Sequence, residues 1–313
     1  MMHPSALAIL GPTASGKTQL ALDLAQVHAI EIISLDSALI YRDMNIGTAK
    51  PNAAELAQVP HHLIDIISPL DSYSAADFCR DALALIQDIQ ARGKLPVIVG
   101  GTMMYYKALT EGLNDLPAAD PAIRAQLQAD KTTLGLLALY QRLQTVDPLT
   151  AERLKAGDSQ RIERALEVFM LTGKPMSQHF QEQEAQKPAL NLTTLALIPE
   201  TRSLLHAQIK KRFDAMMAGG FLDEVRQLQA KYPSLNPDLP SIRCVGYRQA
   251  WAYLAGEDDL AGMTEKSIIA TRQLAKRQLT WLRSLDYELA LDPYTETDLL
   301  APTLALLARK NLA

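Results

Sequence analysis

The chain has 313 residues, of which 48% are hydrophobic and 21% are charged, and this balance excludes a disordered chain. A formal net charge of −4 argues against a protein coated with nucleic acid, although it permits one local basic groove. Apolar runs stay short of the ~18 residues of a membrane span, the N-terminus lacks signal-peptide features, and the two cysteines lie far apart. We therefore expect a cytoplasmic protein without a membrane segment, a disulfide framework or a zinc site.

Strand-like and helix-like segments alternate in the first part of the chain. Apolar periodicity and turn residues predict strands over 6–10, 29–37 and 95–102, and helices over 18–28 and 75–93. Strands that alternate with helices in this way predict a parallel sheet flanked by helices, in which ligands bind at the carboxyl ends of the strands.

The character of the sequence changes over residues 114–190, where helical segments are separated by Pro and Gly. Strand character returns at 192–199, and further helical stretches follow it, the last of them over 263–285. The simplest division of the chain is an α/β core, residues 1–113 and 191–313, with an inserted all-helical domain.

A phosphate-binding loop is indicated by residues 11–18, GPTASGKT, which carry the spacing Gly-x4-Gly-Lys-Ser/Thr between a predicted strand and a predicted helix. Backbone N–H groups of such a loop converge on an anion at the helix N-terminus. Lys17 supplies a positive charge, and Thr18 supplies a hydroxyl ligand for Mg²⁺. The residues expected to hold phosphate are Gly11, Thr13, Ala14, Ser15, Gly16, Lys17 and Thr18. The predicted fold is therefore an α/β, P-loop NTPase-like parallel sheet with a helical insertion.

The loop by itself leaves the phosphate compound open. The sequence lacks the Asn-Lys-x-Asp element with which GTPases read guanine. Asp36 ends the strand that follows the loop, where small P-loop kinases carry the carboxylate that binds their acceptor. A small-molecule kinase, an ATP-switched RNA-binding module and a transferase that releases diphosphate are all compatible with these residues.

A longer set of segments is more specific than the loop. These segments are LDSALIYRDMNIGTAKP at 35–51, HHLID at 61–65, PVIVGGTMMYY at 96–106, QRIERALEVFMLTGKP at 160–175, IRCVGYRQ at 242–249 and TRQLAKRQLTWLR at 271–283. Together with GPTASGKT they closely resemble the bacterial tRNA dimethylallyltransferase family, in order and over nearly all of the chain. The resemblance implies transfer of the dimethylallyl group of dimethylallyl diphosphate to N6 of adenosine at tRNA position 37, in tRNAs that read codons beginning with U. It also implies release of diphosphate and a requirement for Mg²⁺. We expect a monomer, although the residues themselves do not decide whether the protein self-associates.

The resemblance assigns roles to four residues. Asp36 accepts the proton of the adenine amine as the new bond forms. Lys17 and the loop amides stabilise the departing diphosphate, and Arg212 matches the family arginine that reaches it. Thr102, just past the third predicted strand, orients groups near the reacting centre.

An adenine stacked in an anticodon loop must be extruded before its N6 reaches a closed site. The expected partner is therefore the tRNA anticodon stem-loop, held by basic residues around an opening that leads to Asp36. The residues expected to bind tRNA are Asp36, Ser37, Ala38, Leu39, Thr102, Arg124, Gln160, Arg161, Ile162, Glu163, Arg164, Ser241, Ile242, Arg243, Cys244, Val245, Gly246, Arg272, Lys276 and Arg283.

Overall fold

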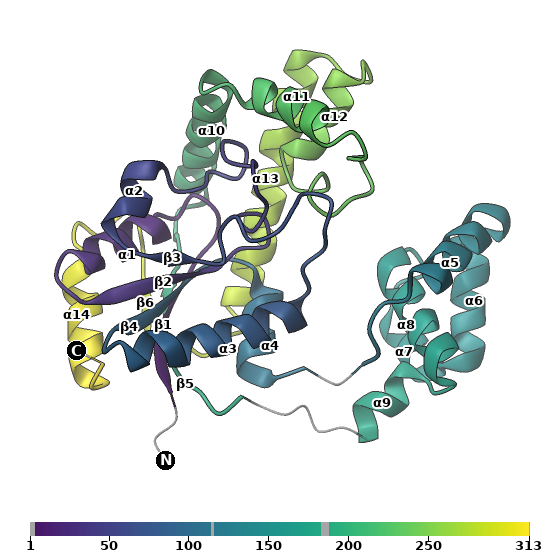
Figure 1. Ribbon diagram of the computed structural model, residues 1–313, viewed down its shortest axis with the longest axis horizontal. Coiled ribbons are helices and arrows are strands. Elements are labelled where there is room, and N and C mark those ends of the chain that lie inside the picture. Colours follow the sequence, from purple (N-terminus) through teal and green to yellow (C-terminus); the bar gives the residue numbers. More distant parts are fainter. Residues whose placement is uncertain (1–3, 114–115, 183–187, 313) are drawn as a thin grey trace. The chain divides into compact units, whose positions relative to one another are not determined.

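The computed structural model describes residues 4–113, 116–182 and 188–312. The chain divides into two compact units, a core unit of Met1–Thr110 with Ala189–Ala313 and an insertion of Glu111–Pro188 (Figure 1). The predicted boundaries, 113/114 and 190/191, lie close to these limits, and residues 114–115 themselves lie outside the described residues.

The core unit is built on one six-stranded sheet in the order β3-β2-β4-β1-β5-β6. Every neighbouring pair of strands is parallel. The strands are β1 Ser5–Leu10, β2 Ile30–Leu35, β3 His61–His62, β4 Leu95–Gly100, β5 Asn191–Leu197 and β6 Leu289–Leu291. The parallel sheet predicted from the alternation of strands and helices is confirmed. The two short edge strands, β3 and β6, carry too few residues for a period-two pattern and were not predicted.

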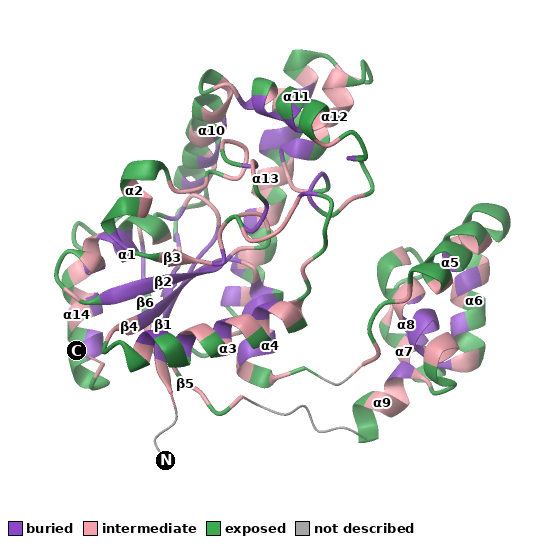
Figure 2. Ribbon diagram, in the orientation of Figure 1, coloured by how far each residue is buried: buried purple, intermediate pink, exposed green. Residues whose placement is uncertain are grey.

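Helices cover both faces of the sheet. Side chains alternate along β1, so that Ala6, Ala8 and Leu10 join one apolar cluster while Leu7 and Ile9 join the other. The first face is covered by α3 Ala75–Ala91, α4 Met103–Glu111, α10 Arg202–Ala218 and α13 Leu260–Leu282, and the apolar cluster of this face continues into α11 Phe221–Lys231 and α12 Tyr247–Leu254, which pack against α10 and α13. The second face is covered by α1 Lys17–Ala25 and α14 Leu300–Arg309. Burial is densest on the strands (Figure 2), and burial on two faces explains their nearly continuous apolar sequences.

The segment between β2 and α2 (Ala53–Gln58) is held by one buried carboxylate. Glu224 of α11 accepts hydrogen bonds from the backbone N–H groups of Asn45 at 2.9 Å, Ile46 at 2.6 Å and Gly47 at 3.1 Å. The Tyr247 hydroxyl donates to the same carboxylate at 2.5 Å. A buried carboxylate needs such partners because its desolvation is costly. The NIGTAKP sequence therefore serves to fix the loop that follows Asp36.

We expect Gly47→Ala to destabilise the core unit by about 1–3 kcal/mol, the range for overpacking a close-packed interior. A Cβ at this position would lie 2.2 Å from the Phe221 ring and 2.6 Å from the Tyr247 ring. Urea unfolding of the wild type and the variant measures the difference in the free energy of unfolding. Gly157→Ala is the control, because a Cβ there meets no atom of the described chain within 4 Å. Equal unfolding midpoints for Gly47→Ala and wild type would contradict the expectation.

The insertion has its own apolar core. Its helices are α5 Pro121–Leu134, α6 Leu136–Val146, α7 Pro148–Arg153, α8 Ser159–Thr172 and α9 Met176–Glu182. Leu127, Leu139, Leu143, Ile162 and Leu166 are among the buried residues that pack together between them. Over its described residues the insertion is helical, as its sequence predicted. Across the described ranges of the whole chain, no helix combines the length and the apolar character of a membrane span.

Candidate active site and nucleic-acid interface

The phosphate-binding loop joins β1 to α1 at the carboxyl edge of the sheet. Ala14 and Gly16 adopt left-handed backbone conformations, with φ of 64° and 79°, and the Ser15 N–H donates to the Pro12 carbonyl at 3.3 Å, so that the chain turns tightly before α1. The Tyr294 hydroxyl donates to the Ala14 carbonyl at 2.8 Å and holds the loop from the outside. Lys17 folds back over the loop and donates to the Pro12 carbonyl at 2.7 Å. This is the geometry expected of a cradle for phosphate oxygens.

Two cations meet at this loop without a matching number of carboxylates. Burial and, to a smaller extent, the Arg212 guanidinium lower the pKa of Lys17 to about 7, against the opposing effect of the Asp36 carboxylate. Burial also lowers the pKa of Arg212, a residue of α10 that donates to the Thr48 carbonyl at 3.2 Å. Neither cation makes an ion pair with a carboxylate of the described residues. Uncompensated positive charge at a loop of convergent N–H groups favours an anionic ligand.

The third charged group, Asp36, follows β2 directly. Its carboxylate accepts from the Ala38 N–H at 2.8 Å, which fixes the turn, and the residue stays partly exposed. Thr102 lies beside it because β2 and β4 are neighbours whose last residues, Leu35 and Gly100, pair in the sheet. The Thr102 hydroxyl accepts from the Ser37 N–H at 3.1 Å. The fold thus brings Asp36, Ser37 and Thr102 together at one strand edge, close enough to Lys17 and Arg212 for electrostatic interaction.

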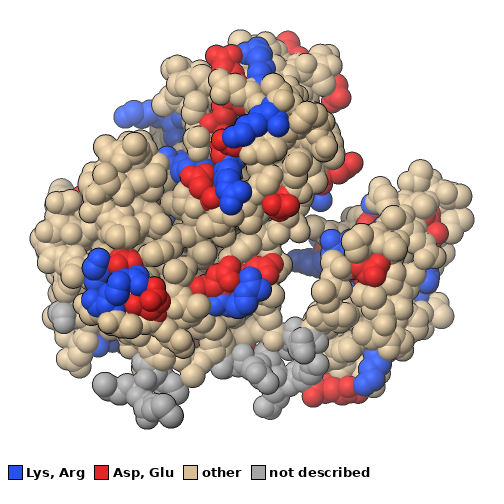
Figure 3. Space-filling view, viewed as in Figure 1, with Lys and Arg blue, Asp and Glu red and all other residues tan. Residues whose placement is uncertain are grey.

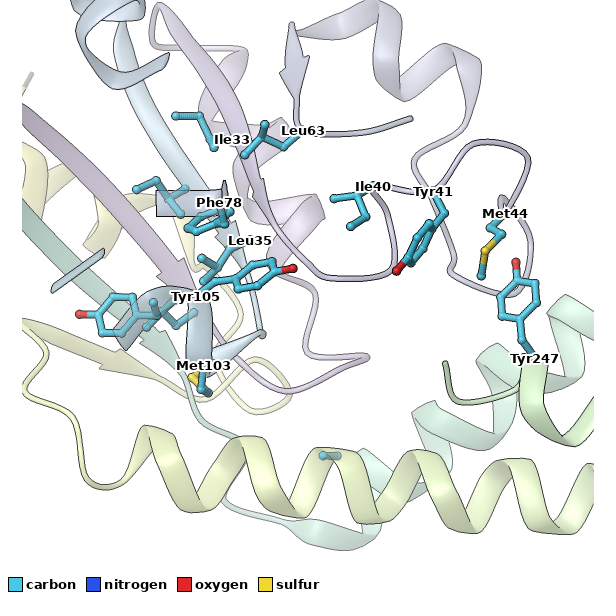
Figure 4. Close-up of a cluster of buried hydrophobic side chains, with 14 of the residues drawn as sticks. Ile33, Leu35, Ile40, Tyr41, Met44, Leu63, Phe78, Met103, Tyr105 and Tyr247 are labelled. Atoms are coloured by element: carbon cyan, nitrogen blue, oxygen red, sulfur yellow. The ribbon is translucent and has the colours of Figure 1, made fainter. Parts of the chain in front are cut away.

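A neutral, aromatic region adjoins Asp36. Burial raises the pKa of the Cys244 thiol to about 12, and the Asp36 carboxylate adds to the shift. Burial also raises the pKa of Tyr105, with smaller contributions from Tyr41 and Asp36. Tyr105 stacks on Phe78 with ring centroids 4.7 Å apart, and Figure 4 shows these side chains among the apolar residues of the first face. The Cys244 thiol and the Tyr105 hydroxyl therefore stay uncharged near neutral pH.

The segment before α12 places its expected tRNA-binding residues in different environments. Arg243 is exposed, whereas Cys244 and Val245 are partly buried. Ser241 and Ile242 are fully buried; the Ser241 hydroxyl donates to the Pro69 carbonyl at 2.6 Å. We correct the expectation for the side chains of these two residues, which belong to the core. Gly246 is also buried, at φ 92°, a conformation that favours glycine.

The long helix α13 and its C-cap residue, Arg283, do not present the three predicted cations equally. Lys276 and Arg283 are exposed, whereas Arg272 is partly buried and its Nε has no hydrogen-bond partner among the described residues. Burial and the nearby Arg272 and Arg202 guanidinium groups lower the pKa of His206. The exposed cations of α13 are therefore the ones available to an RNA phosphate.

In the insertion, one buried carboxylate holds two of the predicted arginines. Glu167, 1% exposed, accepts from Arg124 Nε at 2.9 Å and from Arg164 at 2.7 Å, and also from the Asp120 N–H at 3.0 Å. The Arg124 side chain remains 59% exposed despite this contact. Arg124 is thus oriented by the fold and still accessible, whereas Arg164 is mostly enclosed.

The other residues of the insertion that were expected to bind tRNA also differ in their exposure to solvent. Gln160 and Arg161 are exposed, and Glu163 pairs with Lys131 at 2.7 Å. Ile162 is fully buried in the core of the insertion. We correct the expectation for its side chain, because a residue of an apolar core offers no surface to RNA.

Acidic and basic side chains lie side by side on the face of the molecule drawn in Figure 3. Ion pairs account for many exposed cations, such as Arg80 with Asp77 at 2.9 Å and Lys210 with Asp214 at 2.6 Å. Paired charges contribute little net field at physiological salt. The exposed cations of this face that are paired in this way therefore add little to the attraction of RNA.

Comparison with known proteins places this arrangement in a family. The sequence model of the family described as IPP transferase matches residues 39–285. The chain belongs to the IPP transferase family. A tRNA dimethylallyltransferase of Neisseria meningitidis serogroup A is 60% identical over 296 residues, covering 95% of both chains. One of Ralstonia pickettii is 61% identical over 290 residues, covering 90% of this chain and 88% of the relative.

Solved structures of this family have the same fold. The tRNA isopentenylpyrophosphate transferase of Bacillus halodurans is 34% identical, with a TM-score of 0.69 over 99% of this chain and 98% of that one. A eukaryotic dimethylallyltransferase, described as acting on tRNA, is 27% identical, with a TM-score of 0.82 over 98% of this chain and 79% of that one. The P-loop-type fold expected from residues 11–18 is confirmed.

Three side chains that hold predicted site residues in place, two in the core unit and one in the insertion, were not found from the sequence. Gln278 of α13 contacts the phosphate-binding loop, Tyr294 supports that loop, and Glu167 orients two arginines. Of these three, only Glu167 could have been predicted from the sequence, because a carboxylate three residues after Arg164 on a helix is placed to form an ion pair with it. The partners of Gln278 and Tyr294 lie far from them in the sequence, and no local pattern announces such contacts.

Proposed function

We propose that this protein transfers the dimethylallyl group of dimethylallyl diphosphate to N6 of adenosine 37 in the anticodon loop of tRNA, releasing diphosphate. The observation that carries the proposal is the meeting of Lys17, Arg212 and Asp36 at one sheet edge, in a chain that belongs to the IPP transferase family. The relatives named tRNA dimethylallyltransferase match along most of the chain, which disfavours a small-molecule kinase and an ATP-switched RNA-binding module.

In this mechanism the N6 nitrogen of the base forms a bond with C1 of the allylic group while the bond between C1 and the diphosphate oxygen breaks. The amine is a poor nucleophile because its lone pair is delocalised into the ring. Asp36 accepts the proton that N6 loses, a contribution of about 10²–10⁴-fold in rate. Lys17, Arg212 and the N–H groups of the phosphate-binding loop stabilise the negative charge that develops on the diphosphate.

A divalent metal ion fits this site. Thr18 is exposed in the first turn of α1, next to the loop, and its hydroxyl makes no hydrogen bond with a described residue. Mg²⁺ is commonly bound by one or two protein oxygens together with substrate phosphates and water. We propose that Thr18 holds Mg²⁺, which neutralises charge on the diphosphate when both are bound.

The RNA partner is recognised by separate groups of residues in this proposal. The flipped adenine lies beside Asp36, Ser37 and Thr102, where extrusion from the stack makes N6 accessible. Exposed cations of α13 and of the insertion, among them Lys276 and Arg124, contact phosphates of the anticodon stem-loop.

The deciding experiment incubates the protein with Mg²⁺, labelled dimethylallyl diphosphate and unmodified tRNA that has adenosine 37, in the absence of ATP. We expect label to enter the tRNA, and to be lost when adenosine 37 is replaced by another nucleoside or when Mg²⁺ is removed with a chelator. Absence of transfer, together with binding or hydrolysis of ATP, would refute the proposal in favour of a nucleotide-dependent function.

The phosphate contacts of α13 give a separate prediction on salt dependence. Lys276→Ala is expected to weaken tRNA binding several-fold and to reduce the slope of log affinity against log salt by about 1. Filter binding over a range of KCl concentrations measures both quantities. Lys266→Ala is the matched control on the same helix, because Lys266 pairs with Asp258 at 2.7 Å. A slope that stays at the wild-type value in Lys276→Ala would exclude Lys276 from the interface.

A further inference from the structure

One side chain of α13 connects the two halves of the catalytic site. The Gln278 amide oxygen accepts from the Thr13 N–H in the phosphate-binding loop at 2.9 Å. Its amide nitrogen donates to the Gly101 carbonyl, just past the end of β4, also at 2.9 Å. The side chain is partly buried, which strengthens both hydrogen bonds relative to water.

The contact at Gly101 continues directly to the acceptor side of the site. Gly101 is followed by Thr102, whose hydroxyl accepts from the Ser37 N–H at 3.1 Å, next to Asp36. A short series of contacts therefore runs from Thr13, through Gln278 and the Gly101–Thr102 backbone, to the turn that carries Asp36. The Gln278 amide therefore connects the phosphate-binding loop to the turn that carries the Asp36 carboxylate.

The glycine at position 101 is required by this contact. A Cβ there would lie 2.4 Å from the Gln278 amide nitrogen and 2.9 Å from the Gly11 carbonyl oxygen. Any larger residue would displace the amide from the backbone that it contacts. The Gly100-Gly101 pair thus permits both the close approach of β4 to β2 and the seating of Gln278.

The chemistry of the two contacts selects glutamine. One partner is an N–H donor and the other is a carbonyl acceptor, so the bridging side chain needs an acceptor and a donor on the same planar group. Glutamate has no N–H for the Gly101 carbonyl and adds a negative charge close to the anion-binding loop. Lysine has no acceptor for the Thr13 N–H.

We propose that Gln278 is a positioning residue that sets the distance between the allylic diphosphate and the adenine amine. The proposal rests on the proposed function. Gln278 touches neither reactant in this view and acts by holding Thr13 and Gly101 in register. Misplacement of reacting groups by about 1 Å can cost on the order of 10²-fold in rate, so loss of the bridge is expected to lower the rate of the chemical step more than it weakens binding. Lys276 lies on the same helix as Gln278. In this proposal α13 therefore contacts both the tRNA and the phosphate-binding loop.

The test compares single-turnover transfer rates of the wild type, Gln278→Ala and Gln278→Glu at saturating donor and tRNA. We expect both variants to lose about 10–100-fold in rate, with tRNA dissociation constants within about threefold. The donor dissociation constant stays within about threefold in Gln278→Ala, whereas the added charge of Gln278→Glu raises it, and saturating donor removes this effect from the measured rate. Gln278→Glu keeps the size and packing of the side chain, so a role in packing alone would leave this variant at the wild-type rate. Gln273→Ala, at an exposed position of the same helix, is the control.

Wild-type rates in Gln278→Glu, or a loss that appears only in the dissociation constants, would overturn the positioning role. Each of these outcomes is distinct from failure of the proposed function, because in them the wild type transfers label to adenosine 37. A wild-type protein that transfers none would refute the proposed function itself. If Gln278→Ala is unstable, the comparison of Gln278→Glu with Gln273→Ala decides the question alone.

Discussion

Asp36→Asn is expected to lower the rate of prenyl transfer by about 10²–10⁴-fold and to leave tRNA affinity within a few-fold of wild type. Asparagine retains an oxygen that accepts from the Ala38 N–H, so the turn after β2 keeps its conformation. What it loses is the ability to take the proton from N6. The position of Asp36 beside Ser37 and Thr102 shows that the carboxylate is held by the fold and not by a substrate.

Single-turnover transfer and filter binding on the same preparation separate the two effects of this substitution. Asp214→Asn is a suitable control, since it removes the same charge from an exposed position of α10. If Asp36→Asn turned over at the wild-type rate, Asp36 would be removed from the mechanism. If tRNA affinity fell as far as the rate, Asp36 would be a binding residue alone.

Lys17→Ala is expected to reduce the transfer rate by about 10²–10³-fold, the usual effect of removing one donor from an oxyanion-type site. It should also weaken donor binding, because Arg212 and the loop amides are left to hold the diphosphate. Lys17 lies over the loop with its ammonium group against the Pro12 carbonyl, and burial disfavours its charge. A bound diphosphate supplies the missing negative partner.

The lowered pKa of Lys17 makes binding of the diphosphate donor depend on pH. The pKa of Lys17 in the free protein is about 7, so its cationic form predominates below pH 7 and is lost as the pH rises through that value. The diphosphate binds the cationic form and raises the pKa of Lys17, so binding takes up protons near neutral pH. Above pH 7 the affinity of the wild type is therefore expected to fall more steeply than that of Lys17→Ala.

Titration calorimetry in buffers of different ionisation enthalpy measures this proton uptake directly. The diphosphate titrates in both proteins, so the difference between the wild type and Lys17→Ala isolates the contribution of Lys17. The same pH profile in the two proteins would contradict the assignment of this pKa to donor binding.

Arg212 is positioned by a hydrogen bond to the loop of residues 46–51, IGTAKP, and this contact gives that loop a structural role at the site. This arginine of α10 donates to the Thr48 carbonyl, and the loop that carries Thr48 is held by Glu224 through the N–H groups of residues 45–47. The same loop begins at the turn of Asp36. One buried carboxylate of α11 thus supports a segment that touches both the acceptor side and the diphosphate side of the site.

The sequence alone determined the parts of the site whose signal is local. The spacing of Gly11, Gly16 and Lys17 between a strand and a helix was enough to predict the phosphate-binding loop, because its N–H groups and its lysine come from consecutive residues. Strand ends at Asp36 and Thr102 were predicted for a similar reason, since parallel strands bring their carboxyl ends to one edge. The assignment of the acceptor, in contrast, came from the resemblance to a family and not from the loop.

Only the tertiary structure decided which of the predicted side chains face outward and which groups hold the site together. Ser241 and Ile242 fall within a segment of family sequence, yet both are buried by neighbours from other elements. The helical spacing of Ile162 and Leu166, in contrast, already indicated the buried face of α8. Gln278 finds its two partners 265 and 177 residues away in the chain. Such contacts depend on which helices and strands pack together, and the local sequence around Ser241, Ile242 and Gln278 contains no periodic pattern that predicts them.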